Sequence, residues 1–281
     1  MKETTKNLYL TNYNKLIKNG FNSSTSFDAL KKILDTFKIK ETTKNNYYKS
    51  LLYINKEQKI LNDDLYNSIQ TEIKKINNQA FQKTIKGILN EQQKKNYLSW
   101  EDILKTYERI KKDEKNKLKI LLVSLYILFP VRRILDYEKM IYTTKKPKQQ
   151  KEDTNNYFVD IKKPYFIFNN YKTNTTYKQQ IFKINNDELI SIIRDYVNNE
   201  KIKNNDPLII FNHNAFIAKL RNIFYKYTKK YISVNILRHS YISYMTNNQK
   251  INIPNDRYKL AYAMGHSLNT NIHYYIDEKN I

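Results

Sequence analysis

The 281-residue sequence contains no cysteine and only four histidines. The absence of cysteine excludes disulfides, thiol nucleophiles and cysteine-based metal sites. The histidines are scattered along the chain without close pairing, so a histidine zinc site is not indicated either. We therefore expect a protein whose function uses no bound metal ion.

Long apolar runs are also lacking. The longest apolar stretch lies around residues 120–130 and falls short of membrane-spanning length. The first residues, MKETTKNLYL, lack the long apolar core of a signal peptide. Both absences favour a soluble intracellular protein with no membrane partner, and they do not distinguish the nucleus from the cytoplasm of a host cell.

Arginine is scarce, since only seven of the 50 basic residues are arginine and none lies before Arg109. Basic residues nevertheless outnumber the 27 acidic residues, which gives a formal charge of +23. The excess is +9 in residues 1–95 and +14 in residues 96–281. Codon bias can raise the lysine content, but it does not force lysine and arginine to outnumber acid nearly two to one. Two basic halves indicate a polyanionic partner and suit a C-shaped clamp around duplex DNA.

Residues 1–92 are predicted to form a helical domain. In FDALKKILDTFK the apolar residues recur on one helical face, and Ser26 can cap the start of this helix. Helical patterns follow in TTKNNYYKSLLYI and DDLYNSIQTEIKKI, and no strand-like alternation interrupts them. Gly87 and the polar stretch NEQQKKN at 90–96 are typical of a linker, which places the domain boundary near residues 88–97.

Residues 97–281 are predicted to form a second domain, mainly α with a small antiparallel β-sheet. Ser99 can cap a helix in LSWEDILKTYERI, and the apolar helix KILLVSLYILF ends at Pro130. Three short aromatic and β-branched segments, NNYFVDI, PYFIFN and YKQQIFKI, then predict the sheet over about 157–184. Further helical patterns follow, and Gly265 stands where a left-handed C-cap belongs.

Several basic and polar residues of the second domain form a candidate site. Two arginines follow Pro130, a lysine lies in the turn between two predicted strands, and one arginine lies in the helical segment SVNILRHSYIS. A histidine and a tyrosine pair follow in MGHS and NIHYYID. The candidate residues are Arg132, Arg133, Lys172, Asn235, Arg238, His266 and Tyr275, with Tyr274 beside the last.

These segments resemble the boxes of the tyrosine recombinase, or integrase, family. ILRHSYISYM looks like the family's second arginine box, and MGHSLNTNIHYYI looks like its L-G-H-S box, in which the nucleophilic tyrosine comes nine residues after the histidine. LYILFPVRRILDYEKM looks like the first arginine box, and its wording is most similar to recombinases of AT-rich large DNA viruses, virophages and mobile elements. The resemblance covers about residues 98–278, with the boxes in the family's order.

The resemblance implies a DNA-binding helical domain followed by a catalytic domain that cuts and rejoins DNA. Tyr275 would form a covalent 3′-phosphotyrosine link, which keeps the bond energy, so no cofactor is required. Arg238 and an arginine at 132–133 would stabilise the charge on the phosphate. His266 would donate to the same phosphate, and Lys172 would protonate the leaving 5′-oxygen. In the family, recombination needs a homo-tetramer on two double-stranded DNA sites.

Some alternatives stay open at this point. Counting back from Pro130 favours Arg132 as the first catalytic arginine, whereas counting from Asp136 favours Arg133; we favour Arg132. Tyr274 becomes the nucleophile if the loop shifts by one residue. Asn235 stands where the family usually has histidine or lysine, and asparagine cannot act as a general acid or base. A DNA-binding homologue with impaired catalysis, and a type IB topoisomerase or resolvase with the same chemistry, are therefore alternative functions.

Overall fold

The computed structural model divides into two compact units, Met1–Lys83 (unit 1) and Thr84–Ile281 (unit 2). The structure describes residues 3–147, 153–210, 212–248, 254–268, 270 and 274–276, without the side chains of residues 84, 85 and 254. The two units are treated separately below. The predicted C-shaped clamp and the domain roles at 1–92 and 97–281 stay predictions.

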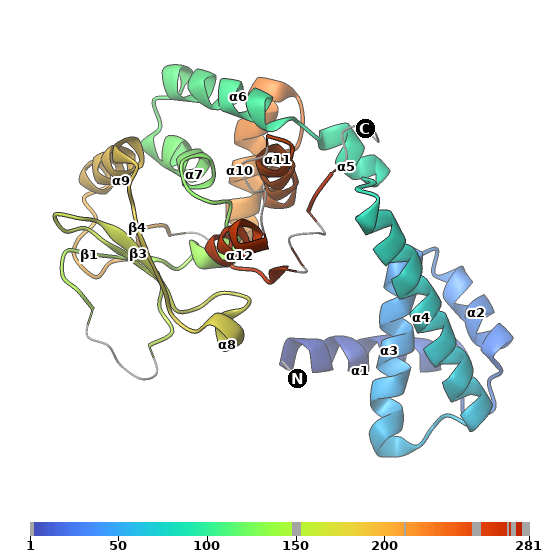
Figure 1. Ribbon diagram of the computed structural model, residues 1–281. Coiled ribbons are helices and arrows are strands. Elements are labelled where there is room, and N and C mark those ends of the chain that lie inside the picture. Colours follow the sequence, from blue (N-terminus) through green and yellow to red (C-terminus); the bar gives the residue numbers. More distant parts are fainter. Residues whose placement is uncertain are drawn as a thin grey trace. The chain divides into compact units, whose positions relative to one another are not determined.

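The described part of unit 1 consists of helices and the loops between them (Figure 1). They are α1 (Glu3–Lys18), α2 (Phe27–Thr36), α3 (Glu41–Gln58) and α4 (Asp63–Ile85), whose last turn continues into unit 2. Ser26 caps α2 as expected, with its side chain accepting from the amide of Ala29. The core is aliphatic and aromatic, and it includes Leu30 and Leu34 from the predicted apolar face of α2.

The expected linker over 90–96 is instead helical. The helix α5 (Glu91–Asn96) begins with a capping box in which Asn90 and Gln93 satisfy each other's amides. Asn96 is buried, and its side-chain oxygen accepts from the amide of Tyr231. The polar composition that suggested a linker thus belongs to a short helix within unit 2.

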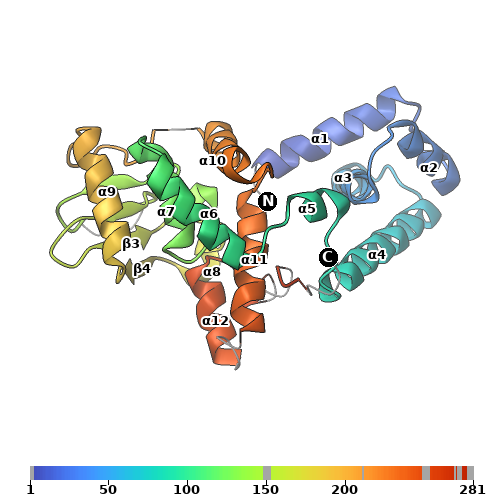
Figure 2. The same ribbon diagram turned by 90° about the horizontal axis from the view of Figure 1, so that it is seen from above.

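Unit 2 carries the remaining helices. They are α6 (Trp100–Asp113), α7 (Lys117–Ile127), α8 (Asn174–Tyr177), α9 (Asp187–Asn199), α10 (His213–Thr228), α11 (Val234–Asn247) and α12 (Pro254–Ala263), with the 3₁₀ turn η1 (Ile134–Asp136). Figure 2 shows α9, α7 and α6 side by side, and α7 contacts both neighbours. The expected cap of α6 is present, since Ser99 accepts from the amide of Asp102. Helix α7 is buried almost all round, which explains its uniformly apolar sequence.

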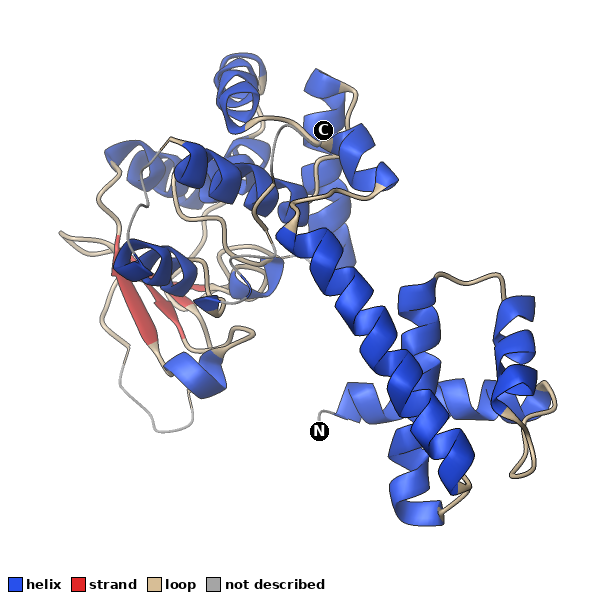
Figure 3. Ribbon diagram, turned by 45° about the vertical axis from the view of Figure 1, so that its right-hand side comes forward, coloured by secondary structure: helices blue, strands red, loops and turns tan. Residues whose placement is uncertain are grey.

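One four-stranded sheet lies at one side of unit 2 (Figure 3). Its order is β1 (Ile141–Thr143), β2 (Tyr157–Val159), β3 (Tyr165–Phe168) and β4 (Gln180–Lys183). The three predicted strands β2 to β4 are antiparallel as expected. The unexpected strand β1 pairs in parallel with β2, so the sheet is mixed rather than antiparallel. Three residues are too few to show an alternating pattern in the sequence.

The predicted fold class is confirmed as mainly α with a small sheet. No helix within the described ranges is both long and apolar enough to cross a membrane. The large core of unit 2 joins α6, α7, α9, α10 and α11 to the inner face of the sheet. Polar side chains are also buried in this unit, and three of the candidate residues, Arg132, Arg238 and His266, are among them.

Candidate active site

The backbone carbonyl of Gly265 is a meeting point for three distant segments. Arg133 Nη1 donates to it over 2.9 Å, and Thr173 Oγ1 donates to it over 3.2 Å. Gly265 follows α12 with a φ of +65°, the left-handed conformation expected for a C-cap. The next residue is His266, so this turn brings the first arginine box, the β3–β4 turn and the histidine box together.

Arg238 and His266 form the buried centre of the site, and both side chains are fully buried. Arg238 Nη1 donates to the carbonyls of Val131 and Met264, and Arg238 Nη2 bonds His266 Nδ1. A guanidinium can only donate, so Nδ1 must be the acceptor and Nε2 must carry the proton. Helix α11 supplies the arginine and the turn after α12 supplies the histidine.

Two buried donors at this centre have no partner among the described residues: Arg238 Nε and His266 Nε2. Leaving a buried donor unsatisfied costs about 1–3 kcal/mol, so two adjacent cases need an explanation. An anionic ligand with several acceptor oxygens, such as a phosphate, would satisfy both. The pair therefore has the chemistry of a preorganised anion site.

The protonation states of the two residues follow from their burial. Burial and the positive charge of Arg238 together lower the pKa of His266 to about 2, so the ring is neutral. Burial and the nearby Arg133 lower the pKa of Arg238 to about 10, which still leaves the guanidinium charged near neutral pH. The centre thus offers one charged and one neutral donor to a ligand.

The adjacent residues Arg132 and Arg133 occupy very different environments. Arg132 is fully buried, donates to Asp136, Gln180 and the carbonyl of Ala263, and lies 3.8 Å from the ring centre of Phe168. Arg133 is half-buried and lines an open pocket together with Asn235. Arg132 is committed to holding the fold around Gly265, whereas Arg133 has donors left for a ligand.

Lys172 lies, as predicted, in the turn between β3 and β4, just before the short helix α8. Its side chain is exposed, and within the described part of the chain it forms no ion pair. The neighbouring Thr173 bonds the carbonyl of Gly265, so the start of this turn is fixed at the site. No ion pair with a described residue fixes the position of its ammonium group.

The tyrosine pair is divided between two environments. The ring of Tyr274 stacks on that of His266, with centroids 5.7 Å apart, and lies 4.7 Å from Arg238 Cζ. Its hydroxyl lies 3.5 Å from Asn235 Oδ1. The hydroxyl of Tyr275 instead donates to Asn247 Oδ1 over 3.3 Å. In this conformation Tyr274, rather than Tyr275, lies against the arginine–histidine pair.

Residues 274–276, the tyrosine segment, are tethered by His239, which follows Arg238 in α11. Its Nδ1 lies 2.9 Å from the carbonyl of Tyr274, and its Nε2 lies 3.2 Å from Gln93 Nε2. A carbonyl only accepts, so Nδ1 carries the proton and Nε2 accepts from the amide of Gln93. Burial lowers the pKa of His239 to about 4, which keeps the ring neutral.

Ile276 anchors the other end of the same segment. Its side chain is fully buried in a small cluster with Leu89 and Tyr97, and its amide donates to Ser243 Oγ over 2.9 Å. The tyrosine segment is therefore held by α11 on one side and by the chain around α5 on the other. Neither contact involves the hydroxyl groups of Tyr274 and Tyr275.

Several residues of the site carried no signal in the sequence. Arg221 lines the same pocket as Arg133 and Asn235, but it belongs to no box of the resemblance. Three further residues reach the site through side-chain hydrogen bonds from different elements, namely Gln93, Gln180 and Asn247. The scarcity of arginine was the one available hint for Arg221, because each arginine in a lysine-rich chain carries more information than a lysine.

Comparison with known proteins gives little further information. No protein-family profile matches the chain, and no curated protein matches it. The fold is similar to a solved structure entitled "Crystal structure of XerA recombinase", with a TM-score of 0.46 and 12% sequence identity. The similarity covers all of this chain and 90% of that chain. The roles of the residues above are therefore argued from their own geometry.

Proposed function

We propose that this chain is a DNA strand transferase that cuts and rejoins DNA through a covalent tyrosine–phosphate intermediate. More specifically, we propose a site-specific recombinase or integrase, acting as a homo-tetramer on two duplex sites and serving a virus or mobile element. The observation that carries the proposal is the pair of unsatisfied buried donors, Arg238 Nε and His266 Nε2, beside a tyrosine ring. A backbone phosphate matches these donors in charge and in its number of acceptor oxygens.

In the proposed reaction the tyrosine oxygen attacks the phosphorus of one DNA phosphodiester. The bond from phosphorus to the tyrosine oxygen forms, and the bond from phosphorus to the 5′-oxygen breaks. The phenol proton passes to water, and Lys172 donates a proton to the leaving 5′-oxygen. Arg238 and Arg133 stabilise the charge on the non-bridging oxygens, and neutral His266 donates from Nε2. A 5′-hydroxyl from another strand reverses these steps and joins the strands.

We propose Tyr275 as the nucleophile, because it lies nine residues after His266. Its hydroxyl now bonds Asn247, so attack requires the segment to shift and release this bond. Tyr274 is the alternative, because its ring already packs on His266 and Arg238. We also propose Arg133 instead of the initially favoured Arg132 as the second phosphate-binding arginine, since the donors of Arg132 are engaged in the fold.

The test is capture of the covalent intermediate. A binding site is first selected from a random duplex pool, and nicked suicide versions of it are incubated with the protein. We expect an adduct that survives denaturation, is lost in Tyr275→Phe and persists in Tyr274→Phe. The reverse pattern would make Tyr274 the nucleophile. An adduct in the double Phe variant, or none with wild type, would refute the proposed reaction.

The two arginines provide a matched test of the site. Arg133→Gln should lower the rate of adduct formation by about 10²–10³, since it removes one charge-stabilising donor, without unfolding unit 2. Arg132→Gln should instead destabilise unit 2 by about 3–5 kcal/mol, because it leaves the buried Asp136 without its partner. Equal loss of stability in both variants would contradict this division of roles.

A second candidate function is DNA binding without strand transfer. The position of the Tyr275 hydroxyl on Asn247, away from Arg238, favours it, as does Asn235 in place of an acid or base. Such a protein would bind the selected duplex with steep salt dependence and form no adduct. Relaxation of supercoiled plasmid without sequence preference would instead indicate a topoisomerase.

A further inference from the structure

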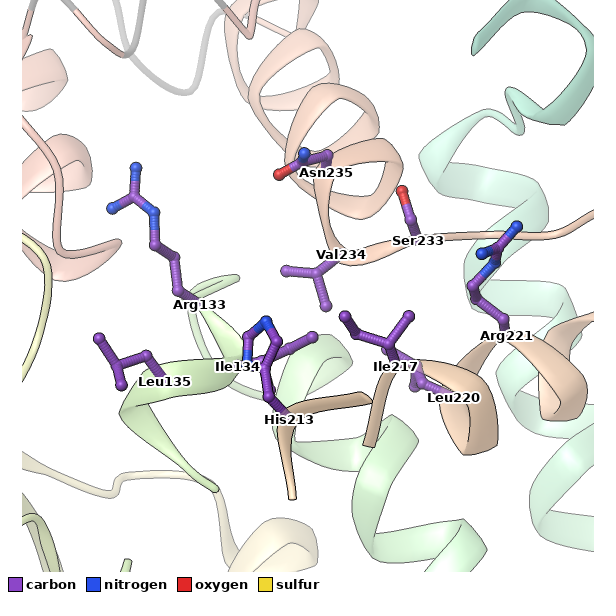
Figure 4. Close-up of a pocket in the computed structure, with 10 residues that line it drawn as sticks. All are labelled: Arg133, Ile134, Leu135, His213, Ile217, Leu220, Arg221, Ser233, Val234 and Asn235. Atoms are coloured by element: carbon purple, nitrogen blue, oxygen red, sulfur yellow. The ribbon is translucent and has the colours of Figure 1, made fainter. Parts of the chain in front are cut away.

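A pocket of about 260 Å³ opens beside the proposed reaction centre, between η1, α10 and the start of α11. Its floor is aliphatic, and its rim is polar. Figure 4 shows Arg133 and Arg221 on opposite sides of it, with Asn235 on α11 above. The lining residues are Arg133, Ile134, Leu135, His213, Ile217, Leu220, Arg221, Ser233, Val234 and Asn235.

Neither arginine of the pocket forms an ion pair with a carboxylate in the described ranges. Arg133 donates once, to the carbonyl of Gly265, and Arg221 contacts the ring of Tyr231. An acid does lie near the rim, but Glu138 is paired with His213 over 2.6 Å. Among the described residues, the pocket therefore presents two cations, Arg133 and Arg221, without a carboxylate partner.

Arg221 is held in place by an aromatic column. Its Cζ lies 5.3 Å from the ring centre of Tyr231, which stacks on Tyr225 with centroids 4.4 Å apart and planes 12° apart. Lys229 Nζ lies 5.7 Å from the ring of Tyr225 at the far end. Both rings remain exposed, at 39% for Tyr225 and 43% for Tyr231, so burial alone does not explain the column. The column orders Arg221 and Lys229 before a ligand binds, which lowers the entropy that these side chains lose when they bind an anion.

We propose that this pocket is a second phosphate site, which holds the sugar–phosphate backbone next to the attacked phosphodiester. Arg133 reaches the attacked phosphate from one side, and Arg221 grips the neighbouring phosphate from the other. The deoxyribose between them covers the aliphatic floor formed by Ile217 and Val234. The ligand class rests on the proposed DNA function, whereas the test below measures binding without strand transfer.

The salt dependence of duplex binding tests the site. Binding of a short fluorescent duplex is measured by anisotropy over a series of NaCl concentrations, in the Tyr274→Phe, Tyr275→Phe background. Losing one phosphate contact should reduce the slope of log K against log salt by about 0.9. Arg221→Gln should show this reduction and bind about tenfold more weakly. Arg221→Lys, which keeps the charge, should keep the slope.

Arg109 provides the matched control, because it lies 5.8 Å from the ring of Tyr227 and does not line the pocket. Arg109→Gln removes the same charge from a similar environment. If Arg221→Gln changes the slope no more than Arg109→Gln does, the phosphate site is refuted. Thermal unfolding of both variants shows whether weaker binding comes from misfolding, and a wild-type slope in a folded Arg221→Gln protein also refutes the site.

A single neutral methylphosphonate, moved stepwise along the selected duplex, locates the phosphate. Each contacted linkage should weaken binding of the background protein, and Arg221→Gln should become insensitive at one linkage, adjacent to the cleaved one. Insensitivity only at a remote linkage would overturn the location. The two proposals fail separately: a slope loss without any wild-type adduct refutes strand transfer and leaves the phosphate site standing.

Discussion

The cores of the two units bury different kinds of side chains. In unit 1 the buried polar residues are neutral, namely Asn12, Thr25, Asn45 and Ser50. Unit 2 buries Arg132, Asp136 and Arg238, and it also buries His239 and His266. Burying charge is costly unless it is paired or used. Among the described residues, buried charge is therefore confined to unit 2, and it is this charge that the proposed site would explain.

The largest expected effect comes from the charge at the centre of unit 2. Arg238→Gln should lower the single-turnover rate of adduct formation by about 10²–10³, because it removes the donor aimed at the phosphate. Rates are measured on the selected suicide duplex at saturating protein. A loss smaller than tenfold in a folded variant would mean that this buried charge is structural, and the contrast between the cores would disappear.

The counterpart in unit 1 is Leu51, which is fully buried in α3. Leu51→Ala should lower the free energy of unfolding of unit 1 by about 2–5 kcal/mol, since it leaves a cavity. Urea unfolding with hydrogen-exchange detection in α3 measures this loss. At low temperature, where the variant is folded, the rate of adduct formation on bound DNA should equal that of wild type. A reduced chemical rate would show that the core of unit 1 also shapes the site.

Lowering the pH should destabilise unit 2 more than unit 1, because all four histidines lie after residue 83. The pKa values of His239 and His266 are lowered from 6.5 to about 4 and about 2 by burial. In the unfolded chain these two rings take up protons at a higher pH than they do in the folded chain. The stability that depends on the two neutral rings is therefore fully present above about pH 6.5. It falls as the pH is lowered, by at most about 1.4 kcal/mol per pH unit for each ring.

Hydrogen exchange from about pH 7 to about pH 5, corrected for intrinsic rates, measures this effect. Helix α11 should lose protection over this range, and α3 should lose much less. His239→Asn provides the control, since it should remove the part of the slope due to His239. Equal slopes in α3 and α11 would contradict burial of the neutral rings as the cause.

The smallest expected effect comes from a matched pair of helix caps. Ser26 caps α2 in unit 1 and Ser233 caps α11 in unit 2, each accepting an amide over 3.3 Å. Each serine-to-alanine change should cost about 1 kcal/mol of local stability. Only Ser233→Ala should also slow adduct formation, because α11 carries Asn235 and Arg238. An equal effect of both changes on the rate would show that the site is insensitive to the start of α11.

Local rules explain which parts of the fold the sequence predicts well. The caps at Ser26 and Ser99 and the C-cap at Gly265 depend on a few neighbouring residues, and they are present. The apolar periodicity of α2 likewise marks the face that becomes buried. The short strand β1 had no such local pattern, so tertiary pairing decided its structure. Helix α5 had one local sign, the Asn90–Gln93 capping box, but its polar composition outweighed this sign in the prediction of a linker.

The sequence singles out the candidate residues, but it does not show how their surroundings differ. Arg132 and Arg133 look alike in the sequence, and only the packing of Phe168, Asp136 and Gly265 buries one and leaves the other at the pocket. Tyr274 and Tyr275 also look alike in the sequence, but their hydroxyls contact different residues of α11, Asn235 and Asn247 respectively. Contacts between residues far apart in the chain fix these choices, and no local pattern encodes them.

The imidazole of His239 has a consequence for spectroscopy. Its two nitrogens face unlike partners, a carbonyl at Tyr274 and an amide at Gln93, so a single tautomer fits. Nitrogen-15 NMR distinguishes a protonated ring nitrogen from one with a free lone pair. When the tyrosine segment detaches from His239, the signals of the two ring nitrogens should move toward a common average. This one ring can therefore act as a built-in reporter of whether the segment is seated, without any added label on the DNA.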